Sequence, residues 1–341
     1  MKKGLSLLLT IICLIIFIFP VSAFSTDGKS LNGVEISMLR FALRVQGKSN
    51  VEIADDLLKK LGVDENWIQI IPDEKKEEIA ISSRIVEKTE YVRTDENGKE
   101  ILITKEEYDL IEPVSNEISL NEGRSISTFA AGDKWEYPTD ETENEEHSTF
   151  ERHLYIYETK NAPVGTFGMI LAYSWKNFGV AYRGTDVMSL SGESLVFNRS
   201  SFLFAAHYEY DEYYLFSTER GIEDYVVEEA TLEDYDDLKG ENNGISYKFG
   251  LPANFSYYDD STGTLLSSKR YLVADYMMIV SAAADDWREN RWFNVYGNYF
   301  HQYMGILVTP EVTITGATVT VSPKLCYKDY LIQTEEQIVY S

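Results

Sequence analysis

The sequence predicts a mainly β protein: an antiparallel β-sandwich or jelly-roll-like C-terminal domain preceded by a small α+β domain. Aromatic residues make up 13% of the 341 residues, including 24 Tyr and 16 Phe, and flat rings favour the pleated surface of a strand. Several segments alternate large apolar with smaller residues, which is the period of a strand with one buried face. Short polar turns separate these segments, as in sandwiches and jelly rolls.

Residues 1–23 have the pattern of an export signal. Lys2 and Lys3 precede an apolar run from Leu5 to Phe19, and Val21-Ser22-Ala23 supplies the small residues of a cleavage site. We therefore expect a secreted protein, extracellular or associated with the cell wall. An uncleaved anchor is the alternative, because the apolar run approaches the length that spans a bilayer.

The formal net charge of −25 at pH 7 restricts the partners of the protein. Such a charge repels phosphate backbones and anionic lipid surfaces, so we expect no nucleic acid partner and no stable membrane span after signal cleavage. Cys326 is the one cysteine left in the mature chain, so no intramolecular disulfide can form, and we expect this thiol to be buried. The lysine-leading signal and the lack of a disulfide pair are typical of a bacterial protein.

Residues 34–112 are predicted to form the small α+β domain. Ser49 and Glu52 make a capping box at the start of a helix with one apolar face, and Gly62 can end that helix in a left-handed conformation. Asp64 is placed to cap a second, short helix. These signals predict helices at the start of the domain.

The period then changes from helix to strand. Asp73 can cap one more helix, after which residues 85–93 are rich in strand formers. Asp95-Glu96-Asn97-Gly98 followed by Ile101-Leu102-Ile103 predicts a β-hairpin.

Residues 113–150 are predicted to be an acidic linker, because they follow neither period and contain the acidic run 139–146. Residues 151–341 are predicted to form the β-rich main domain. The large residues between Phe167 and Trp175 recur at every second position and should share one strand face. Further strands are predicted at 154–157, 178–182, 201–208, 213–217, 246–249, 269–281, 292–305, 311–321 and 338–340. Within 311–321 the alternation is reset at Thr315-Gly316, which predicts a turn or a glycine bulge.

Carboxylates are concentrated in residues 208–238 and again just after Tyr257-Tyr258. Loops with many carboxylate oxygens suit Ca²⁺, which is the one possible cofactor that the sequence indicates. The candidate metal ligands are Asp234, Asp236, Asp237, Asp259 and Asp260. Their spacing follows no known calcium loop, so a solvated acidic face is the alternative interpretation.

Aromatic residues in polar, acidic surroundings are the candidate ligand-binding residues. A ring exposed in such a setting can stack on a sugar or anchor a protein partner, and the alternative is cross-strand packing. The candidates are Tyr213, Tyr214, Tyr257, Tyr258, Trp287 and Trp292.

The sequence assigns no catalytic residue. It contains neither a Gly-x-Ser-x-Gly elbow nor an HExxH motif. Cys326 with His301 can be drawn as a nucleophile and base, and His147, Glu151 and His153 as zinc ligands, but no spacing supports either. We therefore lean against an enzyme.

These observations predict a secreted bacterial, noncatalytic binding or interaction protein. Its partner would be an extracellular glycan, a surface protein or a second copy of itself. An extracellular hydrolase with an N-terminal propeptide is the main alternative, and a secreted toxin or membrane-inserting β protein is a weaker one.

Overall fold

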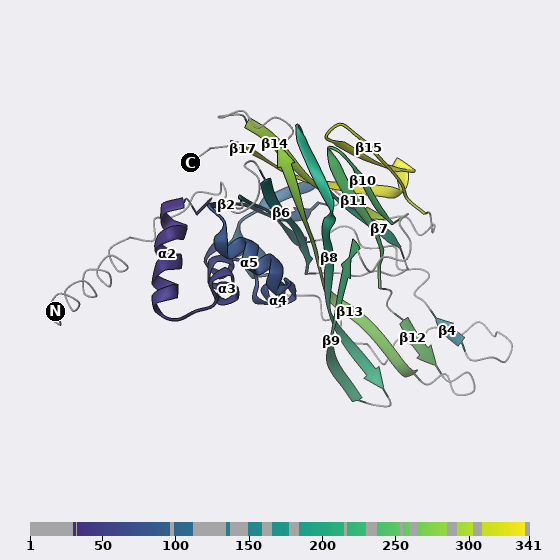
Figure 1. Cartoon of the computed structure of the whole chain (residues 1–341). Helices are drawn as coiled ribbons and strands as arrows, with labels where there is room; N and C mark the ends of the chain where they lie inside the picture. The colour runs from purple at the N-terminus through teal and green to yellow at the C-terminus, as the bar shows by residue number, and fades with distance from the viewer. Residues whose placement is uncertain are drawn as a thin grey trace, which may run out of the picture.

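The computed structural model describes residues 30–31, 33–95, 99–111, 134–136, 149–158, 166–176, 184–214, 217–229, 237–252, 255–258, 265–284, 292–302 and 309–337. These residues form mostly antiparallel β-sheet with a small N-terminal helical part (Figure 1). This architecture confirms the predicted fold class. The predicted signal, most of the predicted linker and the strands predicted at 178–182 and 338–340 lie outside the described residues.

The helices precede the first long strand. They are α2 (Gly33–Val45), α3 (Asn50–Leu61), α4 (Glu65–Ile70) and α5 (Asp73–Ile81), and a short α6 (Lys105–Asp109) comes later. The predicted capping box is present, because the Ser49 side chain accepts from the Glu52 N–H while the Glu52 side chain accepts from the Ser49 N–H. Gly62 ends α3 at φ 93°, and Asp64 caps α4. The prediction for Asp73 is wrong by one position, because Pro72 is the N-cap of α5 and Asp73 is already helical.

The large sheet has ten strands among the described residues. They are β1 (Ser30–Leu31), β2 (Arg84–Thr94), β3 (Glu100–Ile103), β4 (Lys134–Glu136), β5 (Thr149–Glu158), β6 (Thr166–Trp175), β8 (Leu195–Tyr214), β9 (Ser217–Glu228), β12 (Phe255–Tyr258) and β13 (Leu265–Ala284). The order β1-β2-β5-β6-β13 continues through β8 to β9, while the start of β13 also pairs with β12 and then β4. The predicted hairpin is confirmed as β2 and β3.

The small sheet has the order β10-β11-β7-β14-β17. Its strands are β7 (Thr185–Gly192), β10 (Leu238–Glu241), β11 (Gly244–Gly250), β14 (Trp292–Gln302) and β17 (Tyr327–Gln337). A separate hairpin joins β15 (Glu311–Thr315) to β16 (Thr318–Ser322). Gly316 lies in its turn at φ 59°, so the predicted reset at this position is confirmed.

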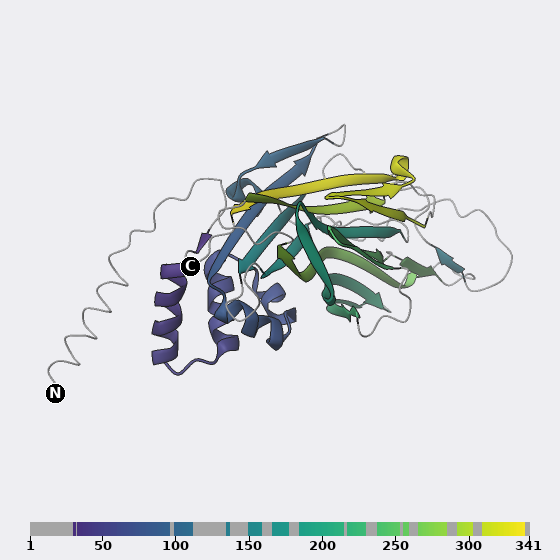
Figure 2. The same ribbon diagram turned by 45° about the horizontal axis from the view of Figure 1, so that its top comes forward.

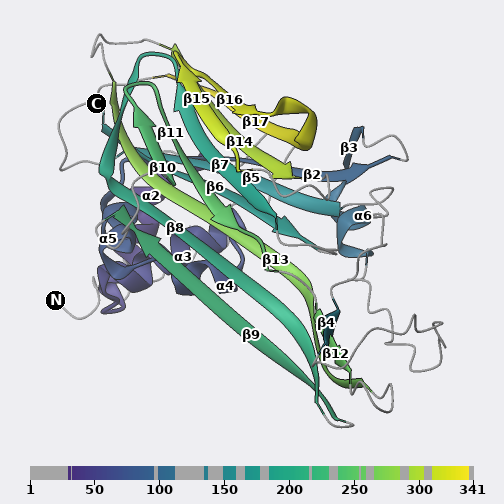
Figure 3. The same cartoon turned by 90° about the vertical axis from the view of Figure 1, so that its right-hand side faces the viewer.

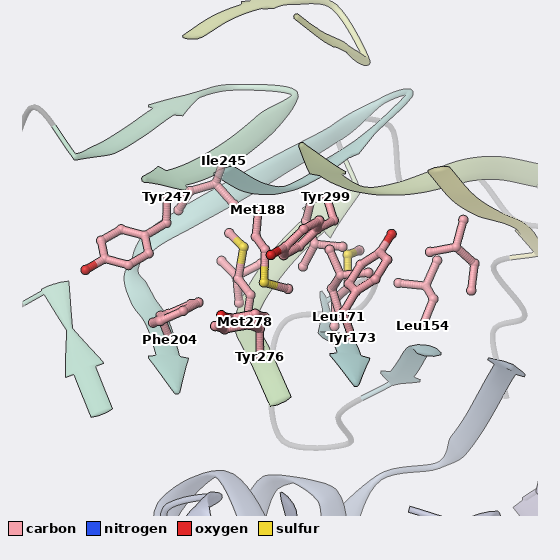
Figure 4. Packing of buried hydrophobic residues seen from close by; sticks show 14 of the residues in the cluster. Leu154, Leu171, Tyr173, Met188, Phe204, Ile245, Tyr247, Tyr276, Met278 and Tyr299 are labelled. Atoms are coloured by element: carbon pink, nitrogen blue, oxygen red, sulfur yellow. The ribbon is translucent and has the colours of Figure 1, made fainter. Parts of the chain in front are cut away.

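Helices, large sheet and small sheet lie in three layers (Figure 2). The main core fills the space between the two sheets and is rich in tyrosine and phenylalanine (Figure 4). A second core lies between the large sheet and the helices. Strand β6 contributes to both: Phe167 to Trp175 at every second position face the main core, as predicted, while Ile170 and Ala172 face the helices.

The N-terminal segment is joined to the later strands through the large sheet. Strand β2 pairs with β5 over ten residue pairs, from Arg84 opposite Glu158 to Arg93 opposite Thr149. The second core combines helix residues such as Leu57 with Met277 of β13. The stretch 113–150 therefore does not divide two separate hydrophobic cores.

Two predictions about strands need correction. Residues 213–217 do not form a strand of their own, because β8 continues to Tyr214 along its partner β13 and β9 begins at Ser217. No strand is predicted between residues 218 and 245, but the acidic segment 208–238 contains β9, which is largely exposed and pairs with β8 along its whole length.

Candidate functional site

One end of the large sheet extends past the small sheet as a narrow set of strands (Figure 3). It consists of the end of β8, the first part of β9, the start of β13, and β12 with β4. We call this part the ribbon and define it as residues 134–136, 208–214, 217–224, 255–258 and 265–272. The ribbon holds four of the tyrosines that the sequence nominates for ligand binding.

The strand register places Tyr214 and Tyr257 on one row across the ribbon. Tyr257 is opposite Ser267 in one strand pair, and Ser267 is opposite Tyr214 in the next. Directly opposed residues project from the same face of a sheet, and neighbouring strands lie about 4.8 Å apart. The two side chains are therefore about 10 Å apart at their bases, with only a serine between them.

This row is accessible from solvent. Tyr214 is 62% exposed, and Tyr257 and Ser267 are partly exposed. Glu212, two positions along β8 on the same face, and Glu219 opposite it on β9 are both exposed. The row thus combines two aromatic side chains with carboxylate acceptors beside them.

A ladder of tyrosines supports the same face from the core outward. The ring centroids of Tyr208 and Tyr276 are 5.9 Å apart, those of Tyr208 and Tyr271 are 5.6 Å apart, and those of Tyr210 and Tyr271 are 5.7 Å apart. The ammonium of Lys269 lies 3.7 Å from the centroid of the Tyr210 ring, a cation–π arrangement. These contacts join the ribbon face to the main core and fix its orientation.

The Lys269 ammonium is also held by a carboxylate. It donates to Glu223 of β9 at 2.8 Å. Burial lowers the pKa of Lys269, but the bonds with Glu223 and Tyr271 outweigh this and raise it. The lysine is therefore charged at neutral pH and links β13 to β9 across β8.

The structure distributes the other aromatic candidates differently. Tyr213 is 7% exposed and belongs to the opposite face of β8, so it is not available for stacking. Tyr258 is partly exposed and follows a register irregularity in β12. Trp292 begins β14 in the small sheet, and Trp287 lies outside the described residues. The candidate site therefore centres on Tyr214 and Tyr257.

The structure describes only one of the five candidate calcium ligands. Asp234, Asp236, Asp259 and Asp260 lie outside the described residues, and the carboxylate of Asp237 lies 3.5 Å from the Lys248 ammonium. Within the residues that the structure describes, no group of three or more His, Cys, Asp or Glu side chains could hold a metal ion. Ca²⁺ binding at these aspartates stays a prediction.

A polar cluster lies on the helix-facing side of the large sheet. It comprises Glu87, Thr89, Glu151, His153, Ser174, His207 and Asp275. His153 lies 3.6 Å from both Glu87 and Glu151. Burial opposes protonation of His153, but the charge of Glu151 and hydrogen bonds with Glu151 and Glu87 raise its pKa to about 9. The imidazole and Glu151 therefore form a buried ion pair.

Asp275 is the second unusual group of this cluster. Burial raises its pKa to about 7, although a hydrogen bond from Ser174 and the charge of His207 lower it. His207 itself lies 2.6 Å from Asp224 of β9. The cluster therefore combines a buried charged pair with a carboxyl whose pKa is raised by burial.

The nominated Cys326–His301 pair is separated by the small sheet. His301 faces the main core, where it lies 2.9 Å from Asp186 and 5.6 Å from the Trp175 ring centroid. Cys326 is buried as predicted, but in the outer cluster with Phe300 and Val187. Because Phe300 and His301 are adjacent on one strand, their side chains project to opposite faces.

Comparisons with known proteins assign no family. No family model matches the chain, and no curated protein matches it. The collagen-binding subdomain of the Enterococcus faecalis surface protein ACE covers 53% of this chain and 91% of its own, at 10% identity and a TM-score of 0.23. Clostridium perfringens delta-toxin covers 74% of this chain and 88% of its own, at 8% identity and a TM-score of 0.18.

A third structure, of manganese lipoxygenase from Gaeumannomyces graminis with part of zonadhesin from Komagataella pastoris, covers 56% of this chain and 61% of its own. Its identity is 10% and its TM-score is 0.23. TM-scores this low carry no argument about function. None of the helices in the described part of the chain has the length and apolar content needed to cross a membrane.

Proposed function

We propose that this protein is a secreted, noncatalytic binding protein that holds an extracellular glycan on the exposed face of the ribbon. The observation that carries the proposal is the row in which Tyr214 and Tyr257 flank Ser267. The apolar faces of sugar rings stack on aromatic rings. Two rings separated by two strand spacings match an extended polysaccharide better than a single small ligand, because both can stack on one chain.

The charges beside the row favour particular glycans. Glu212 and Glu219 are exposed on the same face as Tyr214, and carboxylates accept hydrogen bonds from sugar hydroxyls or from the ammonium of an amino sugar. The overall charge of −25 repels anionic polymers. We therefore expect a neutral or amino-sugar polysaccharide rather than an anionic one.

The hydrolase alternative has less support. His153, His207 and His301 have side chains that are 6%, 7% and 12% exposed, and each faces a carboxylate. Such pairs stabilise buried charge, and a buried general base needs an opening for its substrate. The ribbon, by contrast, presents its aromatic row to solvent.

Binding of the mature chain, residues 24–341, to insoluble polysaccharides tests the proposal. Chitin, chitosan, cellulose and purified cell wall would serve as probes, with sedimentation of bound protein as the measurement. We expect Tyr214→Ala and Tyr257→Ala each to weaken binding about tenfold, which corresponds to about 1.4 kcal/mol.

The control is Tyr296→Ala, because Tyr296 is a partly exposed tyrosine of the small sheet, away from the ribbon. Its binding should equal that of the unaltered chain. If no polysaccharide retains the protein, or if the two ribbon variants bind as well as the control, glycan binding by the ribbon is wrong.

A further inference from the structure

Strand β9 is an edge of the large sheet in the described residues. It pairs with β8 from Ser217 to Glu228 and with no other described strand. All of its residues except Gly221 and Val227 are exposed. An edge of this length presents a row of backbone N–H and C=O groups that can pair with another strand.

The exposed side chains of β9 are unusual for a protected edge. Ile222, Tyr225 and Val226 are 63%, 52% and 45% exposed. Edge strands are commonly kept from pairing by repelling charges. On β9 the charges do not all repel, because Arg220 and Asp224 have opposite signs and lie at equal distances on either side of Ile222.

This symmetry selects one register for pairing β9 with itself. A two-fold axis at Ile222 places Arg220 opposite Asp224 of the second copy, and Asp224 opposite its Arg220. Opposite charges in cross-strand positions are favourable, and like charges there are unfavourable. The Ile222 side chains of the two copies meet at the axis.

The neighbouring registers of the β9 pair are less favourable, because each sets like charges opposite each other. An axis at Glu223 or Asp224 sets that carboxylate against its own copy, and an axis at Gly221 sets Glu219 against Glu223. The axis at Ile222 has no like charges directly opposite anywhere between Ser217 and Val227. Antiparallel edge pairing about an axis normal to the sheet also keeps the same face of each copy on the same side.

We propose that β9 pairs antiparallel with β9 of a second copy, centred on Ile222, so that the large sheets of the two copies become one continuous sheet. Ser217 of one copy then lies opposite Val227 of the other, so the two Ser217 residues are about 33 Å apart along the strands. Because Tyr214 is opposite Ser217 on β9, the two tyrosine rows lie near opposite ends of the paired strands and on the same face.

The arrangement goes beyond the proposed glycan binding and would make it bivalent. Two sites on one face can engage one polymer together, and linked sites bind more tightly than either site alone. Dimerisation does not depend on the tyrosine row, however. Tyr214→Ala should weaken glycan binding about tenfold without changing the dimer, so the two proposals fail separately.

The mass of the mature chain in solution, measured by light scattering and sedimentation over a wide concentration range at physiological ionic strength, tests the pairing. We expect a dimer that Ile222→Lys converts to a monomer, because two lysines would then face each other at the axis. Leu102→Lys is the matched control: Leu102 lies on β3 and is 63% exposed, as Ile222 is. This control should remain dimeric.

Charge exchange tests the register itself. Arg220→Asp should weaken the dimer at least tenfold, because it sets two aspartates opposite each other on both sides of the axis. Adding Asp224→Arg to this variant should restore the dimer, while circular dichroism checks that each variant is folded. A monomer at every concentration, a dimer indifferent to Ile222→Lys, or a double variant that stays monomeric would each overturn the proposal.

Discussion

Gly168 lies opposite Tyr157 in neighbouring strands of the large sheet. A Cβ atom at position 168 would overlap the ring of Tyr157, which is fully buried in the second core. We expect Gly168→Ala to lower the free energy of unfolding by about 1–3 kcal/mol, the usual cost of overpacking. Thermal melting measures this loss. Gly250→Ala is the control, since nothing lies within 4 Å of a Cβ there, and equal melting temperatures for the two variants would contradict the prediction.

Asp275 makes the stability of the protein depend on pH. Its pKa is raised from 3.8 to about 7 in the folded state, so its neutral form stabilises the fold below pH 4 and this contribution is lost as the pH rises through 7. The loss amounts to at most about 4 kcal/mol. Asp275→Asn stays neutral, so its melting temperature should fall less between pH 5 and 8 than that of the unaltered chain.

His153 makes a second pH-dependent contribution to the stability measured in that experiment. Its pKa is raised from 6.5 to about 9, so the stability that its ion pair contributes below pH 6.5 is lost as the pH rises through 9. Both variants of the Asp275 experiment retain this decline. Parallel melting profiles for Asp275→Asn and the unaltered chain would show that the carboxyl at position 275 does not titrate as argued.

At the level of elements, regular local signals were sufficient to predict structure. Helix α3 has a capping box, one apolar face and a terminal glycine, and the structure contains all three. Strand β6 has five large residues at period two, and all five face the main core. The turn at Gly316 follows from a break in alternation. Each of these patterns lies within a short stretch of sequence.

Strand β9 could not be predicted in this way. Its charged and apolar residues are mixed on both faces, because Val227 is its one buried residue and burial therefore imposes no period of two. Pairing with β8 determines its conformation instead. The pairing of β2 with β5 could not be predicted from the sequence either, because strands that are far apart in the chain carry no local signal of their pairing.

The sequence was sufficient to nominate the residues of the candidate site, but not to predict how they are arranged. Tyr214 and Tyr257 were both nominated from their surroundings, but the row they form depends on the register of both with Ser267. Tyr213 has the same surroundings in sequence, yet it is buried because adjacent strand residues project to opposite faces. Only the register and the face separate the accessible tyrosine from its neighbour.

At the scale of the whole molecule, the charge of −25 acts on every partner. It favours a neutral or cationic glycan, and it opposes the approach of a second copy at low ionic strength. Screening limits this repulsion to about 8 Å at physiological salt. The β9 pair is therefore expected to form under those conditions, where its short-range contacts between Arg220 and Asp224 still operate.

The three layers also determine what happens if the chain is cut between the N-terminal segment and β4. The helices and β2 are bound to the remaining strands by ten residue pairs with β5 and by the second core, where Trp67 and Leu57 lie with Tyr155. A specific protease site placed between residues 113 and 133 should therefore yield two fragments that co-elute in gel filtration and separate only in denaturant. The uncleaved chain carrying the same site is the control. Spontaneous release of the N-terminal fragment would contradict this prediction and favour a removable propeptide. It would mean that β5 and β6 remain stable after they lose the helices that cover one of their faces.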